Sequence, residues 1–204
     1  FSKLWPGVLE AFRLIGSEQI QGRASLGGNI CNGSPAGDSV PALIAAGCIA
    51  LIAGPNGKRE IPIEEFHIGP GKTVLDNGEM LVSLKFPKRE INSSDAYLRM
   101  TPRTEMDIAV VGCGVNITFE NNVCTAARVS LGAVAPTPLL IKEASKIMVG
   151  SDLNSEILDK VSKICMDLCD PIDDKRGTID YRTKVAGVLF KRATLTTIDR
   201  IKGN

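Results

Sequence analysis

The sequence has no excess of charge of either sign. Its 204 residues include 24 lysines and arginines and 23 aspartates and glutamates, which gives a formal net charge of +1. No long run carries one sign. Nucleic-acid-binding proteins usually show a basic patch or stripe. The charge balance therefore argues against a nucleic-acid binder.

Long apolar runs are missing as well. No apolar stretch approaches the roughly 20 residues that a membrane-spanning helix needs, so we expect no membrane span. The chain begins Phe1-Ser2-Lys3, without an initiator methionine or a signal peptide, and a helical pattern follows directly. We interpret this start as an interior cut in a longer polypeptide. The apolar fraction of 44% is enough for a packed core, in one large domain or two small ones.

Clusters of metal-binding residues are absent from the sequence pattern. The six cysteines form no CxxC pair, whereas zinc and iron–sulfur sites use close pairs of cysteines. We therefore expect no metal ligand in this chain, and we expect mostly buried, reduced thiols typical of a cytoplasmic protein. The single histidine is His67, and the Gly-x-Ser-x-Gly motif of a hydrolase nucleophile is absent. A structural role is predicted for His67.

The stretch from Arg23 to Asp38 is rich in glycine. Its paired glycines, Gly27 and Gly28, would let the backbone approach a ligand closely, because glycine has no Cβ. Exposed N–H groups in such a turn can hold an anion such as a pyrophosphate. Asp38 stands where the next apolar run begins, and it could cap that helix or bind a ligand hydroxyl. The alternative is a plain turn between two core elements, since short glycine motifs also occur by chance.

Two other glycine motifs do not match known nucleotide-binding loops. The run Gly69-Pro70-Gly71-Lys72-Thr73 lacks the first glycine of a Walker A loop, because Phe66 occupies that position. The pair Gly112-x-Gly114 lacks the third glycine of a dinucleotide fingerprint, and a predicted strand follows it where a helix is required.

Helices are predicted where apolar residues recur every three or four positions. The first covers residues 5–16, with Pro6 in its first turn and Gly16 as its C-terminal cap. An Ala-rich helix runs from Ser39 to about Ala46. Further helices are predicted over residues 139–148, 157–168 and 181–198. The predicted apolar face of the last helix consists of Tyr181, Val185, Val188, Leu189, Leu195 and Ile198.

Strands are predicted in two regions of the chain. Residues 49–53 and 58–63 flank a Gly-Pro-Asn-Gly turn, and residues 78–87 alternate as an edge strand that ends at a proline. Residues 110–119 and 123–131 read as an antiparallel hairpin. The polar segment 90–95 lies between the two regions, and we predict a domain boundary there. The expected domains are residues 1–93 and 94–204.

The Gly-rich stretch belongs to a longer pattern. Residues 19–30, followed by Ser34-Pro35 and Asp38, strongly resemble a segment of the FAD-binding subunit or domain of the molybdenum hydroxylases. That family includes xanthine dehydrogenase, the aerobic carbon monoxide dehydrogenase medium subunit, and nicotinate and 4-hydroxybenzoyl-CoA dehydrogenase flavoproteins. The resemblance covers nearly the whole chain, and it continues through residues 66–73, 78–87, 96–111 and 180–193.

The resemblance implies an α+β fold in two parts. Residues 1–93 correspond to the second subdomain of a PCMH-type FAD-binding domain. Residues 94–204 correspond to the family's C-terminal domain, an antiparallel sheet with helices. The family's N-terminal FAD subdomain, which has its own Gly-rich loop, is missing from these residues. We therefore expect FAD to be held in the intact subunit.

The resemblance also implies which residues contact FAD. Backbone N–H groups of Gly27, Gly28 and Asn29 would bind phosphate oxygens, and Met80 and Leu81 would lie against the flavin. Arg99 stands where relatives commonly carry lysine, and its charge would favour the anionic reduced flavin. The flavin performs the chemistry, so no catalytic residue is expected in the chain. The remaining expected contacts, several of them to ribityl or sugar hydroxyls, are Ser25, Cys31, Asn32 and Asp38.

In the family, electrons pass from a molybdenum cofactor through a [2Fe-2S] centre to the flavin, and then to NAD or another acceptor. The resemblance thus implies an iron–sulfur subunit and a molybdopterin-binding subunit as partners, with those two cofactors outside this chain. One alternative is a truncated, non-catalytic module that docks partner subunits without holding FAD. Another is a flavin oxidoreductase of the vanillyl-alcohol-oxidase type, which the C-terminal helices do not support. Flavin colour in the purified chain would distinguish an FAD-binding subunit from the docking module.

Overall fold

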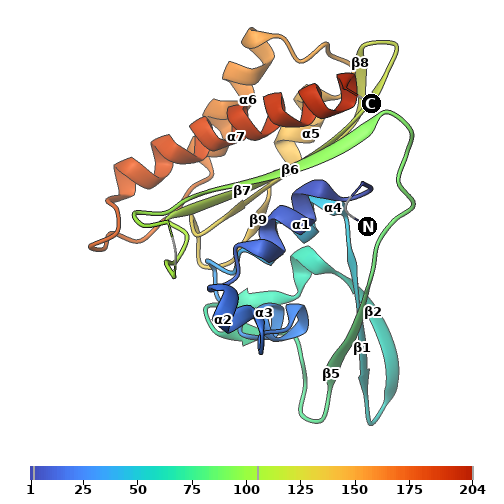
Figure 1. The fold of residues 1–204 in the computed structure, drawn as a ribbon, viewed down its shortest axis with the longest axis vertical. Helices are drawn as coiled ribbons and strands as arrows, with labels where there is room; N and C mark the ends of the chain where they lie inside the picture. Colours follow the sequence, from blue (N-terminus) through green and yellow to red (C-terminus); the bar gives the residue numbers. More distant parts are fainter. Residues whose placement is uncertain (2, 105, 204) are drawn as a thin grey trace.

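The protein combines helices with antiparallel sheets, as the computed structural model shows for residues 1, 3–104 and 106–203 (Figure 1). This confirms the predicted α+β class. The helices are α1 Pro6–Arg13, α2 Glu18–Gln21, α3 Leu26–Cys31, α4 Ser39–Ala46, α5 Lys142–Met148, α6 Ser155–Asp167 and α7 Ile179–Lys202, with a 3-10 turn at Ile63–Glu65. The strands are β1 Ile49–Gly54, β2 Gly57–Pro62, β3 His67–Gly69, β4 Lys72–Thr73, β5 Met80–Lys85, β6 Ser93–Met100, β7 Val111–Glu120, β8 Val123–Gly132 and β9 Leu139–Leu140.

The N-terminal half holds a three-stranded sheet in the order β2-β1-β5. β1 and β2 pair from Ile49↔Pro62 to Gly54↔Gly57, which leaves a two-residue turn. β5 pairs with β1 and forms an edge of the sheet. In Figure 1 these strands extend below the rest of the molecule. The predicted hairpin and the predicted edge strand are both confirmed.

The C-terminal half is built on a four-stranded sheet in the order β6-β7-β8-β9. The predicted β7–β8 hairpin is confirmed, and its turn residues Asn121 and Asn122 have positive φ angles of 50° and 63°. The predicted helix over residues 139–148 begins too early. Leu139 and Leu140 pair with β8 as the fourth strand, and the helix starts only at Lys142.

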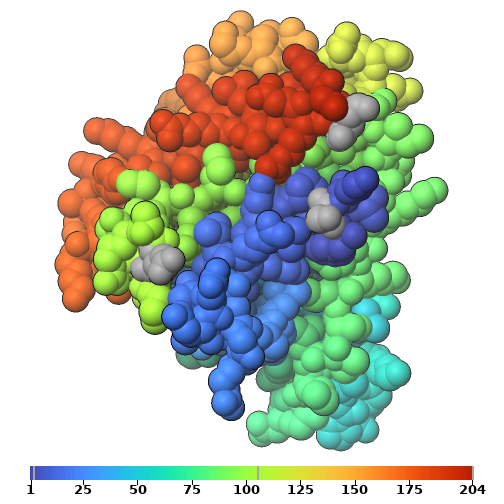
Figure 2. Space-filling model, viewed as in Figure 1, coloured from blue at the N-terminus to red at the C-terminus, as the bar shows by residue number. Residues whose placement is uncertain are grey.

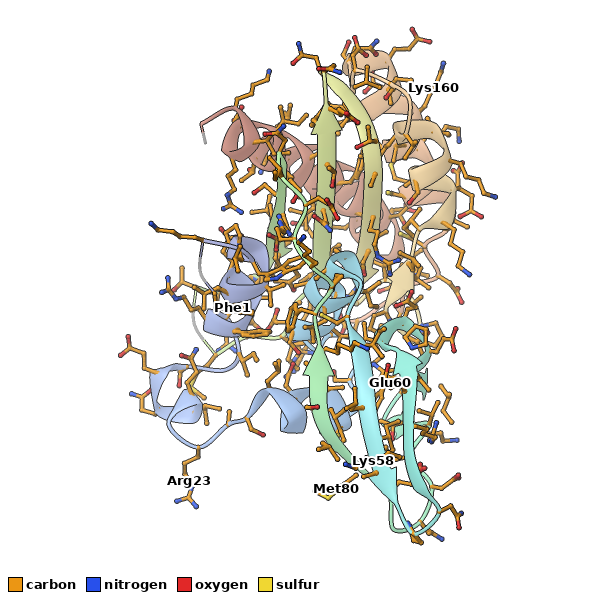
Figure 3. All side chains as sticks on the ribbon, turned by 90° about the vertical axis from the view of Figure 1, so that its right-hand side faces the viewer. Phe1, Arg23, Lys58, Glu60, Met80 and Lys160 are labelled. Carbon is orange, nitrogen blue, oxygen red and sulfur yellow. The ribbon has the colours of Figure 1, made fainter. Side chains whose placement is uncertain are left out.

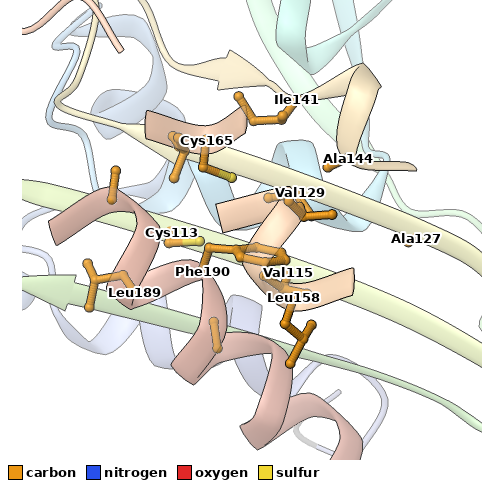
Figure 4. Close-up of a cluster of buried hydrophobic side chains, with 14 of the residues drawn as sticks. Cys113, Val115, Ala127, Val129, Ile141, Ala144, Leu158, Cys165, Leu189 and Phe190 are labelled. Atoms are coloured by element: carbon orange, nitrogen blue, oxygen red, sulfur yellow. The ribbon is translucent and has the colours of Figure 1, made fainter. Parts of the chain in front are cut away.

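Helices cover both faces of this larger sheet. α5, α6 and α7 enclose one hydrophobic core with it, in which the Phe190 ring lies among Cys113, Val115 and Leu158 (Figure 4). α1 and α4 pack on the strands β6, β7 and β8 from the N-terminal half. The second core contains Trp5, Ile30, Phe66 and also Tyr97, which comes from β6. The two halves thus meet along the sheet.

The buried face of α7 differs from the predicted one. Tyr181, Val188 and Leu195 are 40%, 45% and 50% exposed. The contact with α6 and the sheet is made partly by small residues, which let the helix approach closely. A Cβ at Gly187, for example, would lie 2.5 Å from Ser162 Oγ. The buried residues of α7 are Arg182, Ala186, Gly187, Leu189, Phe190, Ala193, Thr194 and Thr197.

Two further expectations need correction near the N-terminus. α1 ends at Arg13 and is capped by Leu14, while Gly16 lies beyond it with φ +61°. The polar segment 90–95 is not wholly a linker, because β6 begins at Ser93 and Asp95 is buried. The Asp95 carboxylate accepts a hydrogen bond of 3.0 Å from the Val8 N–H. Figure 2 shows the N-terminal residues, in blue, packed below the red C-terminal helix.

Candidate functional site

The Gly-rich segment is not a loop throughout, because residues 26–31 form the short helix α3. Ser25 caps it: the Ser25 Oγ accepts the Gly28 N–H at 3.0 Å, and the Ser25 carbonyl accepts the Asn29 N–H at 3.0 Å. The first N–H groups of a helix have no acceptor within the helix. The N–H groups of Leu26 and Gly27 are therefore the ones that the cap leaves for an anion, whereas those of Gly28 and Asn29 serve the helix.

Gly27 faces open space. A Cβ built at Gly27 would meet no atom of the described residues within 4 Å, so none of their contacts requires a glycine there. Gly28 differs, since its Cβ would lie 3.0 Å from the capping Ser25 Oγ. Gly27 borders a hollow of about 480 Å³ between α1, α3 and β5. The residues that line this hollow are Phe1, Phe12, Leu26, Gly27, Leu81, Val82, Ser83, Leu84 and Phe86.

A second hollow of about 270 Å³ adjoins the first, because Phe12 and Leu26 line both. It is lined by Phe12, Arg13, Ile15, Gln21, Ala24, Ser25 and Leu26. We refer to the two hollows together as the α3 groove. Of the predicted contact residues, Ser25, Gly27 and Leu81 line it. Met80 lies next to Leu81 on β5 with 64% of its surface exposed (Figure 3).

Two other predicted residues contact each other. Arg99 Nη1 donates to Asp38 Oδ2 at 2.8 Å, and the Tyr97 hydroxyl donates to Asp38 Oδ1 at 3.0 Å. Burial raises the pKa of Asp38 to about 6, although the Arg99 charge and the two hydrogen bonds oppose the shift. Burial likewise raises the pKa of Tyr97. The same Arg99 nitrogen donates to the Leu14 carbonyl at 2.9 Å. Since Arg13 and Ile15 line the α3 groove, the ion pair lies close to it.

The start of α4 is held by Asn29 and not by Asp38. Asn29 Oδ1 accepts hydrogen bonds from Ser39 Oγ at 2.6 Å and from Ser39 N at 3.4 Å. The Asp38 side chain makes no capping hydrogen bond, so the suggestion that it caps the helix is wrong. Asn29 therefore links α3 to the first residue of α4, directly after Asp38.

The predicted residues Cys31 and Asn32 lie at the other end of α3. Both are exposed, and neither lines the α3 groove. Partial burial raises the pKa of the Cys31 thiol. The structure thus brings most of the predicted residues to one end of α3 and to the helix start at Ser39, and leaves these two at the opposite end.

Sequence reasoning missed several residues of the site. Phe12 and Phe86 line the α3 groove, but their apolar character did not separate them from core residues. Tyr97 stands two positions before Arg99 on the same strand, so both side chains point to one face. That period of two is the signal that could have found Tyr97.

A third hollow, of about 450 Å³, lies where the two halves meet. We call it the seam hollow. At its rim the Arg176 guanidinium lies 3.8 Å from Asp107 and 3.6 Å from Asp174, longer than a hydrogen bond. The hollow is lined by Pro35, Ala36, Pro70, Ile108, Ala109, Ala133, Ala135, Pro136, Asp170, Ile172, Asp174, Arg176 and Arg182.

Metal-binding clusters and membrane-spanning helices are both absent from the described residues. In the part of the chain that the structure describes, no group of three or more histidine, cysteine, aspartate or glutamate residues could hold a metal ion. None of the helices described is long and apolar enough to cross a membrane.

Comparison with known proteins identifies the family. The FAD binding domain in molybdopterin dehydrogenase matches residues 1–89, and the CO dehydrogenase flavoprotein C-terminal domain matches residues 96–197. The chain belongs to the family of molybdenum hydroxylase FAD-binding subunits. The two matches follow one another along the chain, as the resemblance of the sequence predicted.

Individual relatives of this flavoprotein chain agree with the assignment. The carbon monoxide dehydrogenase medium chain of Hydrogenophaga pseudoflava is 31% identical over 92% of the chain, and the xanthine dehydrogenase FAD-binding subunit of Escherichia coli O157:H7 is 30% identical over 92%. The chain spans 65% and 64% of the length of these relatives. A solved CO dehydrogenase from Oligotropha carboxidovorans matches 98% of the chain and 69% of its own, with a TM-score of 0.93 and 31% identity.

The residues present fit a bound FAD. No contact among the described residues explains the glycine at position 27, and it lies beside the two N–H groups that the α3 cap leaves for an anion. An apolar hollow with Leu81 in its wall adjoins them. A flavin dinucleotide needs both features, a donor set for its diphosphate and an apolar wall for its ring system.

Proposed function

We propose that this chain holds part of the FAD site of an electron-transfer subunit in a molybdenum-containing hydroxylase or dehydrogenase. Residues 1–93 would supply the FAD-binding part and residues 94–204 the C-terminal domain. One observation carries the proposal: Gly27 borders the α3 groove with open space at its Cβ position, and it belongs to the segment that matches the family. The protein would act as an oxidoreductase in the cytoplasm, with an iron–sulfur subunit and a molybdopterin-binding subunit as partners.

The chain's own groups would bind and orient the cofactor. When bound, FAD supplies the electron transfer. The N–H groups of Leu26 and Gly27 would donate to diphosphate oxygens, and Leu81 with Met80 would line the apolar side. Ser25, Gly28, Asn29, Cys31 and Asn32 complete the proposed set, with Gly28 and Asn29 acting through the geometry of α3.

Asp38 and Arg99 would add charge to the site. Their ion pair is buried, and Arg99 also donates to the carbonyl of Leu14, whose neighbours Arg13 and Ile15 line the α3 groove. Arg99 would favour a negatively charged flavin, because an opposite charge in a buried site is screened little by solvent. Asp38 would accept a hydrogen bond from a cofactor hydroxyl in addition to the one from Tyr97.

The proposed electron path runs from a [2Fe-2S] partner to the flavin, and then to NAD or another acceptor. We propose the seam hollow for the acceptor. Its wall includes Pro35 and Ala36, which lie after α3 within the Gly-rich segment, and Arg176 at its rim can donate to an anionic group. Apolar walls with a few placed polar groups are typical of small-molecule sites.

A glycine substitution tests the cofactor site. Gly27→Val should weaken FAD binding about tenfold or more, which corresponds to about 1.4 kcal/mol, because its side chain would occupy the space next to the free N–H groups. Gly69→Val is the matched control, since a Cβ at Gly69 would make only an ordinary contact of 3.8 Å with Lys72. The measurement is the quenching of flavin fluorescence during titration with FAD.

The result also separates the proposal from its alternative. Unchanged FAD affinity in Gly27→Val would contradict the placement of the cofactor in the α3 groove. An intact wild-type subunit that stays colourless at millimolar FAD, while it still binds the iron–sulfur partner, would favour the docking module without a cofactor.

A further inference from the structure

His67 connects β3 to the helix of the proposed cofactor site. Its side chain is 7% exposed, and Nε2 lies 2.7 Å from the Ile30 carbonyl oxygen of α3. A carbonyl oxygen only accepts hydrogen bonds, so the hydrogen of the neutral ring is on Nε2. The other ring nitrogen, Nδ1, is buried without a hydrogen-bond partner among the described residues. Burial lowers the pKa of His67, which favours this neutral form.

A second bond joins the same two segments. The Gly71 N–H, between β3 and β4, donates to the Gly33 carbonyl just after α3 at 2.9 Å. The two backbones are in close contact, since a Cβ at Gly33 would lie 2.9 Å from the carbonyl carbon of Gly71. The β3–β4 hairpin therefore holds the C-terminal end of α3 at two points, one through a side chain and one through the backbone.

α3 depends on such anchoring. It has six residues, and two of them are glycines, which lower helix stability. Helices this short are unstable by themselves because nucleation is costly. The cap at Ser25 acts on the N-terminal turn, while His67 and Gly71 act on the opposite end.

We infer that His67 is a positioning residue for FAD, which holds α3 through its Nε2–H bond to Ile30 so that the first turn of the helix meets the diphosphate. The inference rests on the proposed function of the α3 groove. His67 itself does not line the groove and does not contact the cofactor in this arrangement. Its effect is transmitted along a single helix of six residues.

Three substitutions distinguish the hydrogen bond from simple packing. His67→Gln places an amide N–H at about the reach of Nε2, whereas His67→Asn places it one carbon shorter. His67→Phe keeps a ring of similar size but has no donor. We expect His67→Phe and His67→Asn to bind FAD about tenfold more weakly than wild type, and His67→Gln to remain within about twofold.

Amide hydrogen exchange provides a second measurement that does not need FAD. The N–H of Asn32 donates to the Gly28 carbonyl within α3, and that of Gly33 donates to the Ile30 carbonyl. Both should exchange faster in His67→Phe than in wild type and regain protection in His67→Gln. If loss of the His67 bond displaces the whole of α3, the Gly28 N–H at the N-terminal cap should also exchange faster in His67→Phe and regain protection in His67→Gln.

The outcomes have different consequences. If wild type and His67→Phe bind FAD equally, the inference is wrong while the proposed function stands. If His67→Gln is as weak as His67→Phe, the donor has no special role and the inference is again wrong. If neither the wild-type chain nor a longer form of the subunit binds FAD, the proposed function fails, and the inference fails with it.

Discussion

The Asp38 carboxyl group lies in the protein interior beside one cation. Its folded pKa of about 6 is above the ordinary value of 3.8, because burial disfavours the charged form more than Arg99 and Tyr97 favour it. Between these pH values the folded chain binds more protons than the unfolded chain. Asp38 therefore makes its whole contribution to the free energy of unfolding below pH 3.8, and this contribution is lost as the pH rises through about 6.

This linkage predicts the behaviour of Asp38→Asn. The fall in unfolding free energy between pH 4 and pH 6 should be smaller in the variant than in wild type, because the amide does not titrate. Part of the fall should remain, since burial also raises the pKa of Asp95 to about 6. Urea unfolding at half-unit pH steps measures the slope. If the unfolding free energy changed equally with pH in both proteins, the raised pKa of Asp38 would be contradicted.

At the scale of single elements, α7 shows how apolar pattern and burial can diverge. Phe190 is fully buried in the larger core (Figure 4), while Val188 on the same helix is 45% exposed. The predicted face included Val188 and omitted Phe190. The helix instead buries Phe190 together with small residues such as Gly187, which let α7 approach α6 closely.

The pair of residues gives a direct test of the orientation of α7. Phe190→Ala should lower the unfolding free energy by about 4 kcal/mol, the usual cost of a cavity left by a buried phenylalanine. Val188→Ala, as the control, should change it by no more than about 0.5 kcal/mol. Chemical denaturation of both variants measures the difference. Similar losses in the two proteins would show that the helix is rotated relative to this structure.

At the scale of the whole molecule, α4 joins the two halves. It belongs to the Gly-rich N-terminal part, yet it packs against β7 and β8 of the larger sheet. The contact is close, because a Cβ at Gly114 on β7 would lie 2.6 Å from the Pro41 carbonyl oxygen of α4. Arg128 on β8 adds a hydrogen bond of 2.9 Å to the Ile44 carbonyl and an ion pair of 2.9 Å with Glu64.

The close contact predicts that the halves unfold together. Wild type should show one cooperative transition by fluorescence and by far-ultraviolet circular dichroism. Gly114→Val should lower the unfolding free energy by about 1–3 kcal/mol or more, since the added side chain would overpack the interface. Gly69→Val is again the control. Two separate transitions in wild type would show that the halves are independent domains.

Several local elements of this protein follow from its sequence alone. The β1–β2 and β7–β8 hairpins are encoded by alternating residues around Gly, Pro and Asn turns, and α4 by a compact apolar run that ends at Gly47. The family pattern, which spans both halves, also implied the α+β fold. Such features depend on neighbours a few positions apart, so a reading along the chain is sufficient to find them.

The arrangement of the site was decided only by the tertiary structure. Asp38 and Arg99 are 61 positions apart, and His67 is 37 positions from Ile30, so no local pattern could join them. The sequence marked both Gly27 and Gly28, but only the packed chain leaves Gly27 open and assigns Gly28 to the Ser25 cap. Residue types along the chain set which groups are available. Which of them remain free for a ligand depends on the contacts that the other groups make on folding.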